Sequence, residues 1–271
     1  MSSIDSNELR DPSPFKSARR IAVANQKGGV GKTTTVVNFA AAAAETGKRV
    51  LVVDLDPQGN ASTGLGLNPQ DIERSMFEVL LHDAPIDDII EPAGVPNLFV
   101  APSNIRLAGA EIELVSAFSR ETKLKNALDK VSSEYDLIVV DCPPSLGLLT
   151  INAFTAVTEV IVPIQCEYFA LEGVGQLIRN VDLVKKALNR DLVLSHVVLV
   201  MYDGRTNLAT QVVDEIRQHF AERVCRTVIP RSVRLSEAPS YGQPITAFDS
   251  ESRGAAAYRE LSREILGDHA V

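Results

Sequence analysis

Several features that would each indicate a particular class of protein are missing from this sequence. Cysteine is scarce: the 271 residues include only Cys142, Cys166 and Cys225, with no CxxC pair. This argues against a disulfide framework or a metal knuckle and predicts three reduced thiols. No apolar run approaches the length that a membrane span needs. The polar residues before Ile21 also lack the apolar core of a secretory signal, so we expect residues 1–19 to form a short disordered leader.

A positive net charge is also missing. The chain has 35 acidic and 27 basic residues, which gives a formal net charge of −8. A chain of this composition is not a bulk polycation, so any contact with DNA needs a local basic patch. Such a patch is physically reasonable, because charges are screened beyond about 8 Å at physiological salt.

What the sequence does contain is an alternation of strand-like and helix-like segments. Short apolar runs, rich in β-branched residues, alternate with longer segments of helical periodicity, as in parallel sheets covered by helices on both faces. We therefore predict one α/β domain over residues 20–271, with three layers and a mostly parallel, twisted sheet of about seven or eight strands. The predicted strands are 21–25, 49–55, 97–101, 135–142, 160–165, 193–201 and 224–229, and the predicted helices 33–46, 105–131 (with a possible break), 174–188, 208–220 and 253–266.

A glycine-rich loop follows the first predicted strand and leads into the first predicted helix. Its sequence, QKGGVGKT at residues 26–33, fits the P-loop pattern G-x-x-x-x-G-K-[ST] except that Gln26 replaces the first glycine. Glycines let the backbone amides turn toward a phosphate, and the helix N-terminus adds its dipole. Lys32 would reach the β- and γ-phosphates, and the Thr33 hydroxyl would bind Mg²⁺ directly. The predicted ATP-binding residues of the loop are Lys27, Gly28, Gly29, Val30, Gly31, Lys32, Thr33 and Thr34.

Carboxylates stand at the carboxyl ends of two predicted strands. Asp54 and Asp56 close the strand 49–55, two positions apart, so their side chains point the same way if the strand persists. Asp141 follows four hydrophobic residues, which is the form of a Walker B acid. Because parallel strands end at the same edge of a sheet, we expect these three acids to lie near the Mg²⁺ or to reach it through water.

The loop resembles the deviant Walker A motif of the ParA/MinD family of P-loop ATPases. The resemblance extends over nearly the whole chain from about residue 20 and is strongest to the chromosomal ParA proteins, the Soj-like group. The segments that carry it are DLDPQGNASTGLG (54–66), DCPPSLG (141–147), QCEYFALEG (165–173), MYDGRTNL (201–208) and IPRSVRLSEAPS (229–240).

This resemblance implies roles for single residues. Lys27 would be the signature lysine that reaches the partner's nucleotide across an ATP-sandwich dimer. Asp56 would orient the attacking water while Asp54 supports the metal shell. The catalytic set would then be Lys27, Lys32 and Asp56.

The resemblance also places the adenine base in the loop after the last predicted strand. Pro230 and Arg231 would hold the base there. Family members often carry asparagine at the next position, where this chain has Ser232, so a side-chain contact at that point is not implied.

In the Soj-like group, the ATP-bound homodimer binds double-stranded DNA without sequence preference. The DNA-contacting arginines correspond to Arg205 and Arg234, which would contact phosphates. The implied function is ATP-dependent partition of a chromosome or plasmid by a weak ATP hydrolase that a ParB-like protein stimulates. The implied cofactors are ATP or ADP and Mg²⁺. The location would be cytoplasmic and nucleoid-associated, without stable membrane association.

Three alternatives remain open. A MinD-like positioning ATPase would end in a basic amphipathic helix that binds membrane, whereas residues 258–268 have mixed charges and predict a helix packed on the sheet. A reductase with a shared 4Fe–4S cluster would use cysteines, but Cys142 has no second cysteine in a matching context. A scaffold that binds nucleotide without turnover is the third alternative.

Overall fold

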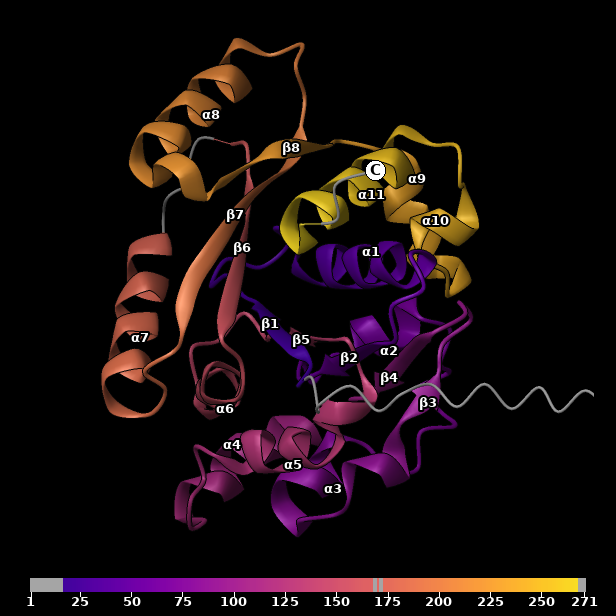
Figure 1. Cartoon of the computed structure of the whole chain (residues 1–271), viewed down its shortest axis with the longest axis vertical. Helices are drawn as coiled ribbons and strands as arrows, with labels where there is room; N and C mark the ends of the chain where they lie inside the picture. The colour runs from indigo at the N-terminus through magenta and orange to yellow at the C-terminus, as the bar shows by residue number, and fades with distance from the viewer. Residues whose placement is uncertain (1–16, 168–169, 171–172, 268–271) are drawn as a thin grey trace, which may run out of the picture.

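The structure is a computed structural model that describes residues 17–167, 170 and 173–267. Within these residues, eight strands form one sheet in the order β3-β4-β2-β5-β1-β6-β7-β8 (Figure 1). All neighbouring strands are parallel except β3 and β4, which pair antiparallel at one edge. The strands are β1 (Arg19–Val23), β2 (Val50–Asp54), β3 (Glu91–Pro92), β4 (Leu98–Ala101), β5 (Leu137–Asp141), β6 (Glu159–Gln165), β7 (Val193–Tyr202) and β8 (Val224–Pro230).

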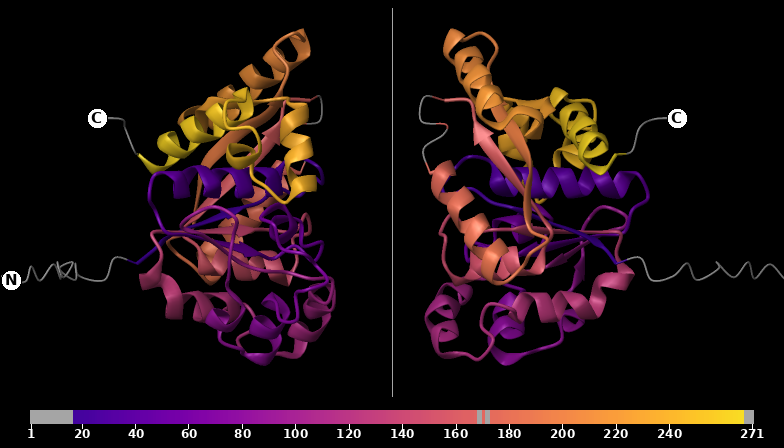
Figure 2. Two further views of the ribbon diagram at one scale, coloured as in Figure 1. Left: turned by 90° about the vertical axis from the view of Figure 1, so that its right-hand side faces the viewer. Right: turned by 60° about the vertical axis from the view of Figure 1, so that its left-hand side comes forward.

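Helices cover both faces of the sheet and make three layers (Figure 2). The larger buried cluster contains side chains of α3 to α8, and the smaller one contains side chains of α1, α2, α9, α10 and α11. The α-helices are α1 (Lys32–Glu45), α2 (Asn60–Gly64), α3 (Met76–His82), α4 (Leu107–Glu113), α5 (Lys123–Val131), α6 (Leu148–Ala156), α7 (Val174–Ala187), α8 (Asn207–Phe220), α9 (Val233–Glu237), α10 (Ile245–Phe248) and α11 (Arg253–Leu266). Short 3₁₀ turns are η1 (Ile86–Ile89), η2 (Leu114–Ser116), η3 (Ser132–Glu134), η4 (Ala221–Arg223) and η5 (Ala238–Tyr241).

The predicted fold class is confirmed: the chain forms a single α/β domain with a mostly parallel sheet between two layers of helices. The helical stretch predicted at 105–131 is interrupted, because η2 and a turn separate α4 from α5. The sequence did not predict α6. Its residues 149–150 and 152–156 are all buried, so it lacks the polar face that makes a helix visible as a periodic pattern.

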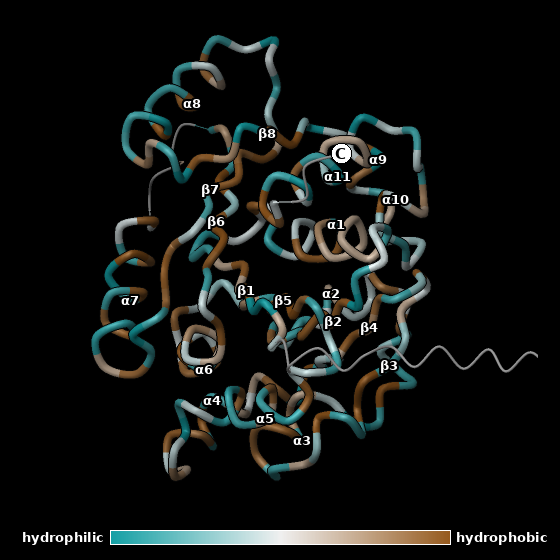
Figure 3. The backbone as a smooth tube through the Cα atoms, in the orientation of Figure 1, coloured by the Kyte–Doolittle hydropathy of each residue, from teal (hydrophilic) through white to brown (hydrophobic). Residues whose placement is uncertain are grey.

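Helix α1 positions the glycine-rich loop, and it is buried almost all round. Its five consecutive alanines, residues 40–44, are buried between the sheet and α11. Small side chains let the helix approach its neighbours closely, and Figure 3 shows apolar residues along α1 and along the strands. The helix, predicted over 33–46, is followed by Gly47, which comes directly after the C-cap Thr46 and has φ 86°.

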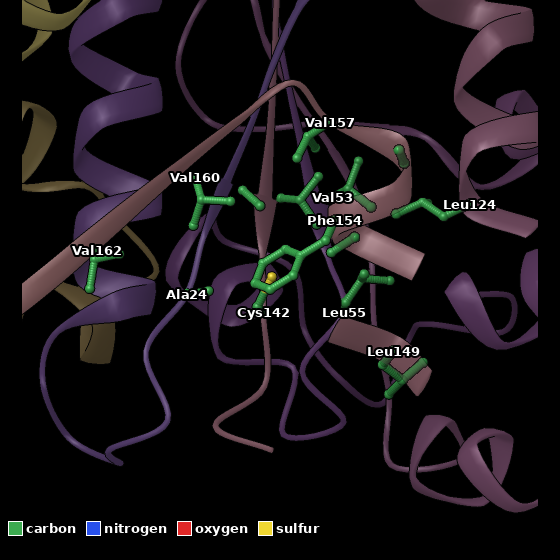
Figure 4. Close-up of a cluster of buried hydrophobic side chains, with 14 of the residues drawn as sticks. Ala24, Val53, Leu55, Leu124, Cys142, Leu149, Phe154, Val157, Val160 and Val162 are labelled. Carbon is green, nitrogen blue, oxygen red and sulfur yellow. The ribbon is translucent and has the colours of Figure 1, made fainter. Parts of the chain in front are cut away.

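The three cysteines are free and buried. Cys142 lies in a packed apolar cluster between the sheet and α6, with the Phe154 ring beside its sulfur (Figure 4). This burial raises the pKa of its thiol. Cys142 is therefore a small core residue.

The first described residues tie the start of the domain to the end of α5 and the turn η3. Ser17 and Ala18 hydrogen-bond to the Ser132 side chain, and β1 begins at Arg19. The predicted leader otherwise falls on residues 1–16, which lie outside the described residues. None of the helices in the described part of the chain is both long enough and apolar enough to cross a membrane.

Candidate nucleotide-binding site

Glycines in left-handed backbone conformations shape the loop between β1 and α1. Gly29 has φ 74° and Gly31 has φ 78°, values that residues with a β-carbon rarely adopt. Asn25 anchors the loop, since its Nδ2 donates to the Pro163 carbonyl at 2.8 Å and its Oδ1 accepts the Lys27 amide at 3.0 Å. The loop leads directly into α1, whose first amides have no helical partner and favour an anion.

The two lysines of the loop differ in their surroundings. Lys32 is buried, and its Nζ donates to the Lys27 carbonyl at 3.2 Å. Burial lowers the pKa of Lys32, while the nearby carboxylates of Asp141 and Asp56 raise it. The Lys27 side chain is only partly buried, and its ammonium has no hydrogen-bond acceptor or ion-pair partner within the described residues. Lys32 is thus held inside the site, and Lys27 stands at its border.

The predicted acids gather beside this loop at the carboxyl edge of the sheet. In the β2–β5 pair, Asp54 lies directly opposite Asp141, and both side chains are completely buried. Asp56 follows two positions beyond Asp54 and is 8% exposed. Its Oδ1 accepts the Gln58 amide at 3.0 Å. The expectation that the three acids share one edge therefore agrees with the geometry.

Asp54 is fully engaged by hydrogen bonds within the protein. Its Oδ2 accepts the amide and the hydroxyl of Ser62 at 2.9 and 2.7 Å, and its Oδ1 accepts the Asp56 amide at 3.1 Å. The Ser62 hydroxyl in turn accepts the Ser103 amide at 3.1 Å. Burial outweighs these bonds and raises the pKa of Asp54 to about 6. The carboxylate ties β2 to α2 and holds the backbone of Asp56.

Asp141 presents the opposite case. Both of its carboxylate oxygens are buried, and neither accepts a hydrogen bond from the residues that the structure describes. Burial raises the pKa of Asp141 well above its ordinary value, the charge of Asp54 adds to this, and Thr33 and Lys32 act against it. A buried carboxylate without partners is costly unless a cation joins it.

This chemistry fits Mg²⁺. The ion prefers hard oxygen ligands, keeps several waters, and is usually bound by one or two protein groups together with substrate phosphates. The Thr33 hydroxyl and the Asp141 carboxylate are such groups: Thr33 ends the phosphate loop in the first turn of α1, and Asp141 lies next to it at the end of β5. The residues present therefore suit a magnesium ion that binds together with a nucleotide.

A cavity of about 210 Å³ lies where the resemblance placed the base. Pro230, Arg231 and Ser232 line it, and so do Met201 and Tyr258, which the sequence did not indicate. Met201 has φ 53°, a strained value for a residue with a side chain, as often found near binding sites. Arg231 is held in place, since its guanidinium contacts Glu167 at 2.8 Å.

A second cavity, of about 400 Å³, adjoins the first across the start of α1. Thr33, Asn38 and Asn60 line it, and it shares Thr34 and Pro239 with the base cavity. The two cavities thus meet at Thr34, directly after the residue that would bind the metal. Both cavities therefore lie beside the first turn of α1, where the phosphate loop ends.

The two arginines expected to contact DNA lie outside this cluster. Arg205 follows β7, its side chain is 86% exposed, and its guanidinium binds Asp203 through two hydrogen bonds of 2.8 and 2.6 Å. Arg234 is on α9 and contacts Asp249 at 2.8 Å and Glu237 at 3.1 Å. Both guanidinium groups therefore form surface ion pairs with carboxylates of their own chain.

Comparison with known proteins identifies the family. A family model described as an AAA domain matches residues 18–194. The chain is 57% identical over 248 residues to the sporulation initiation inhibitor protein Soj of Bacillus subtilis, which covers 92% of this chain and 98% of that protein. The chain belongs to the ParA/Soj family of chromosome-partitioning ATPases. Within this family it is also 49% identical to the chromosome partitioning protein ParA of Myxococcus xanthus, over 92% of this chain and 88% of that protein.

Solved structures support the same fold. A Mycobacterium smegmatis protein described as cobyrinic acid a,c-diamide synthase, solved with ADP and magnesium, is 41% identical and covers 92% of this chain and 94% of its own, with a TM-score of 0.82. The cell division ATPase MinD of Pyrococcus furiosus is 26% identical over 93% of this chain and 100% of its own, with a TM-score of 0.76. Nucleotide and Mg²⁺ therefore bind to this fold, as expected for a ParA-type ATPase.

Proposed function

We propose that this ParA/Soj-family chain is a weak ATPase that Mg-ATP switches into a DNA-binding homodimer. The observation that supports this most strongly is the buried, unpartnered carboxylate of Asp141 beside the Thr33 hydroxyl and the Lys32 ammonium. A set of one hydroxyl, one carboxylate and one lysine at a glycine-rich loop suits a magnesium-bound triphosphate. The similarity to partition proteins supplies the cellular role.

Each group at the phosphate end has a role that follows from its position. The loop amides and the N-terminus of α1 bind phosphate oxygens, and Lys32 leaves the Lys27 carbonyl to contact the β- and γ-phosphates. Thr33 and Asp141 hold the Mg²⁺, directly or through water, and the ion supplies charge neutralisation when it is bound. The cavity lined by Pro230 and Arg231 takes the adenine base.

Hydrolysis needs an oriented water and neutralisation of the charge that develops on the γ-phosphate. We assign Asp56 to the water, because it lies beside Lys32 and Asp141 and its backbone is fixed by Asp54. The Lys27 ammonium has no acceptor among the described residues of its own chain, and we assign it to the nucleotide of the second copy. Turnover is slow until a ParB-like protein stimulates it.

DNA binding depends on how the arginines are arranged. Arg205 and Arg234 are paired with carboxylates in the single chain, so each binds phosphate only weakly by itself. Dimerisation doubles the number of these groups on one surface, and contacts to phosphates add up without reading sequence. The protein would therefore act in the cytoplasm on the nucleoid, bound in the ATP state and released after hydrolysis.

The experiment that tests this proposal is binding to nonspecific duplex DNA with ATP, ADP or no nucleotide at fixed moderate salt. We expect binding with ATP alone, and the binding should weaken as salt rises. Arg205→Glu and Arg234→Glu should each abolish it while ATP-driven dimerisation, measured by light scattering, persists. Arg226→Glu is the matched control for Arg205→Glu, because both side chains are 86% exposed and Arg226 lies on β8.

DNA binding that ignores the nucleotide would contradict the switch. Absence of DNA binding in all three states would contradict the partition reading and favour a MinD-like membrane ATPase. Sedimentation with anionic liposomes in ATP would then be the next measurement. Loss of both DNA binding and dimerisation in the arginine variants would place these residues in the fold or the dimer interface instead.

A further inference from the structure

The carboxylate of Glu111, on α4, is packed against Gly147, the residue that precedes α6. A methyl group on Gly147 would lie 2.8 Å from Cδ of Glu111 and closer still to Oε1. Gly147 has φ −90°, which any residue adopts, so the backbone itself does not require glycine here. The carboxylate of Glu111 occupies the space that a side chain at Gly147 would need.

One oxygen of the Glu111 carboxylate lacks a hydrogen-bond donor. Oε1 of Glu111 is buried and has no hydrogen-bond partner within the described residues. A buried acceptor without a partner destabilises the fold, because the hydrogen bonds it would make to water are not replaced. A buried negative charge is favourable only where amide groups or cations lie nearby.

The N-terminus of α6, in turn, lacks a side-chain acceptor for its first amides. Its N-cap is Gly147, which has no side chain to cap the helix, and its first turn contains no acidic residue. The first amides of a helix require acceptors, and a nearby anion stabilises them. The Glu111 carboxylate, which lacks a donor at Oε1, thus lies against the first amides of α6, which lack a side-chain acceptor.

The segment between Asp141 and α6 is short and stiff. It contains Pro143 and Pro144, whose rings restrict the backbone. Its other end is fastened to α6 by the Thr150 hydroxyl, which donates to the Ser145 carbonyl at 2.6 Å. A change in the position of Gly147 is therefore transmitted to Asp141 rather than absorbed by the loop.

We propose that Glu111 is a positioning residue of the magnesium-nucleotide site. Its carboxylate binds the N-terminal amides of α6 in the nucleotide-bound state, and it thereby fixes the loop that begins at Asp141. This inference rests on the proposed function, because it assigns Asp141 to Mg²⁺. In this proposal Glu111 contacts neither the nucleotide nor the metal. Its removal should therefore change how strongly nucleotide binding depends on Mg²⁺, and it should leave the phosphate loop intact.

The test measures binding of a fluorescent ADP analogue to the full chain over a series of Mg²⁺ concentrations. For Glu111→Gln we expect the half-saturating Mg²⁺ concentration to rise about tenfold, as for other residues that orient a metal ligand through hydrogen bonds. Affinity for the analogue without Mg²⁺ should stay at the wild-type value. Glu113→Gln is the matched control, since Glu113 lies on the same helix but is exposed.

Gly147→Ala provides an independent variant, because its methyl group would push the flexible Glu111 side chain away from α6. It should raise the half-saturating Mg²⁺ concentration as Glu111→Gln does, and the double variant should show no further increase. A residue with a purely structural role would instead lower the melting temperature and weaken binding with and without Mg²⁺ alike.

Wild-type Mg²⁺ dependence in Glu111→Gln, or additive effects in the double variant, would overturn the inference. Failure of the proposed function has a different signature: the wild-type chain would not bind the analogue, or its binding would not respond to Mg²⁺. The variants are therefore interpreted only against a wild type that shows this response, and either of the two results then decides the role of Glu111.

Discussion

The ends of β2 and β5 lie side by side in the sheet and carry carboxylates in opposite situations. At the β2 end, Asp54 accepts three hydrogen bonds, from Ser62 twice and from the Asp56 amide. At the β5 end, Asp141 is equally buried but accepts none within the described residues. Burial raises the pKa of each carboxyl; three hydrogen bonds act against this at Asp54, whereas at Asp141 the charge of Asp54 raises the pKa further and Thr33 and Lys32 lower it.

The two carboxylates therefore have different roles at one edge of the sheet, one structural and one in metal binding. At the β2 end the hydrogen bonds are already complete without a ligand, because Asp54 fixes α2 and the backbone of Asp56. The β5 end is left incomplete, and Asp141 keeps both oxygens for a cation. A site that binds Mg²⁺ only with a nucleotide needs such a group, since a carboxylate already paired with donors would have little affinity left for the metal.

The largest expected effect concerns the residue that the β2 end holds in place. Asp56→Ala should lower the rate of ATP hydrolysis by about 10²–10⁴-fold, the usual contribution of a positioned proton acceptor. Mg-ATP binding and ATP-driven dimerisation should remain, because Asp56 is not needed to hold the metal. Phosphate release and light scattering measure the two properties separately. Turnover at the wild-type rate would show that the β2 end does not carry the chemistry.

A smaller effect is expected at the β5 end, and it concerns affinity rather than turnover. Asp141→Ala should remove most of the gain in ATP affinity that Mg²⁺ provides, a loss of about 10–100-fold in the presence of the ion. Affinity without Mg²⁺ should not fall, because the variant also removes a negative charge beside the phosphate loop. Calorimetric titration with and without Mg²⁺ measures both. An equal loss under both conditions would mean that Asp141 supports the fold and not the metal.

The phosphate end of this site could be predicted because its chemistry is local in sequence. The glycines, Lys32 and Thr33 belong to one loop, and Asp54 and Asp141 each end a strongly apolar strand. Parallel strands bring their carboxyl ends to one edge whatever the details of packing. The alternation of strands and helices was equally local, so the fold class followed from it.

The partners of those residues could not be predicted in the same way. The Ser62 side chain, eight residues beyond Asp54, becomes its main donor only because α2 folds back on β2. Met201 and Tyr258 line the base cavity from distant segments, and Glu111 on α4 packs against Gly147, which precedes α6. Such contacts depend on the tertiary arrangement and leave no spacing pattern. The pairing of Arg205 and Arg234 with acids of their own chain was likewise invisible, although it bears on DNA binding.

The smallest expected effect tests the comparison most directly, because the same truncation is made at both strand ends. Asp54→Ala leaves the donors of Ser62 and Asp56 buried without an acceptor, which should lower the free energy of unfolding by about 2 kcal/mol. Asp141→Ala removes a buried carboxylate that accepts no hydrogen bond, although it also removes one of the carboxylates beside Lys32, so we expect a smaller loss of stability than in Asp54→Ala. Urea unfolding without nucleotide and Mg²⁺ measures both variants. Equal destabilisation of the two would mean that Asp141 is held by the fold as firmly as Asp54, and the division of work between the two strand ends would be wrong.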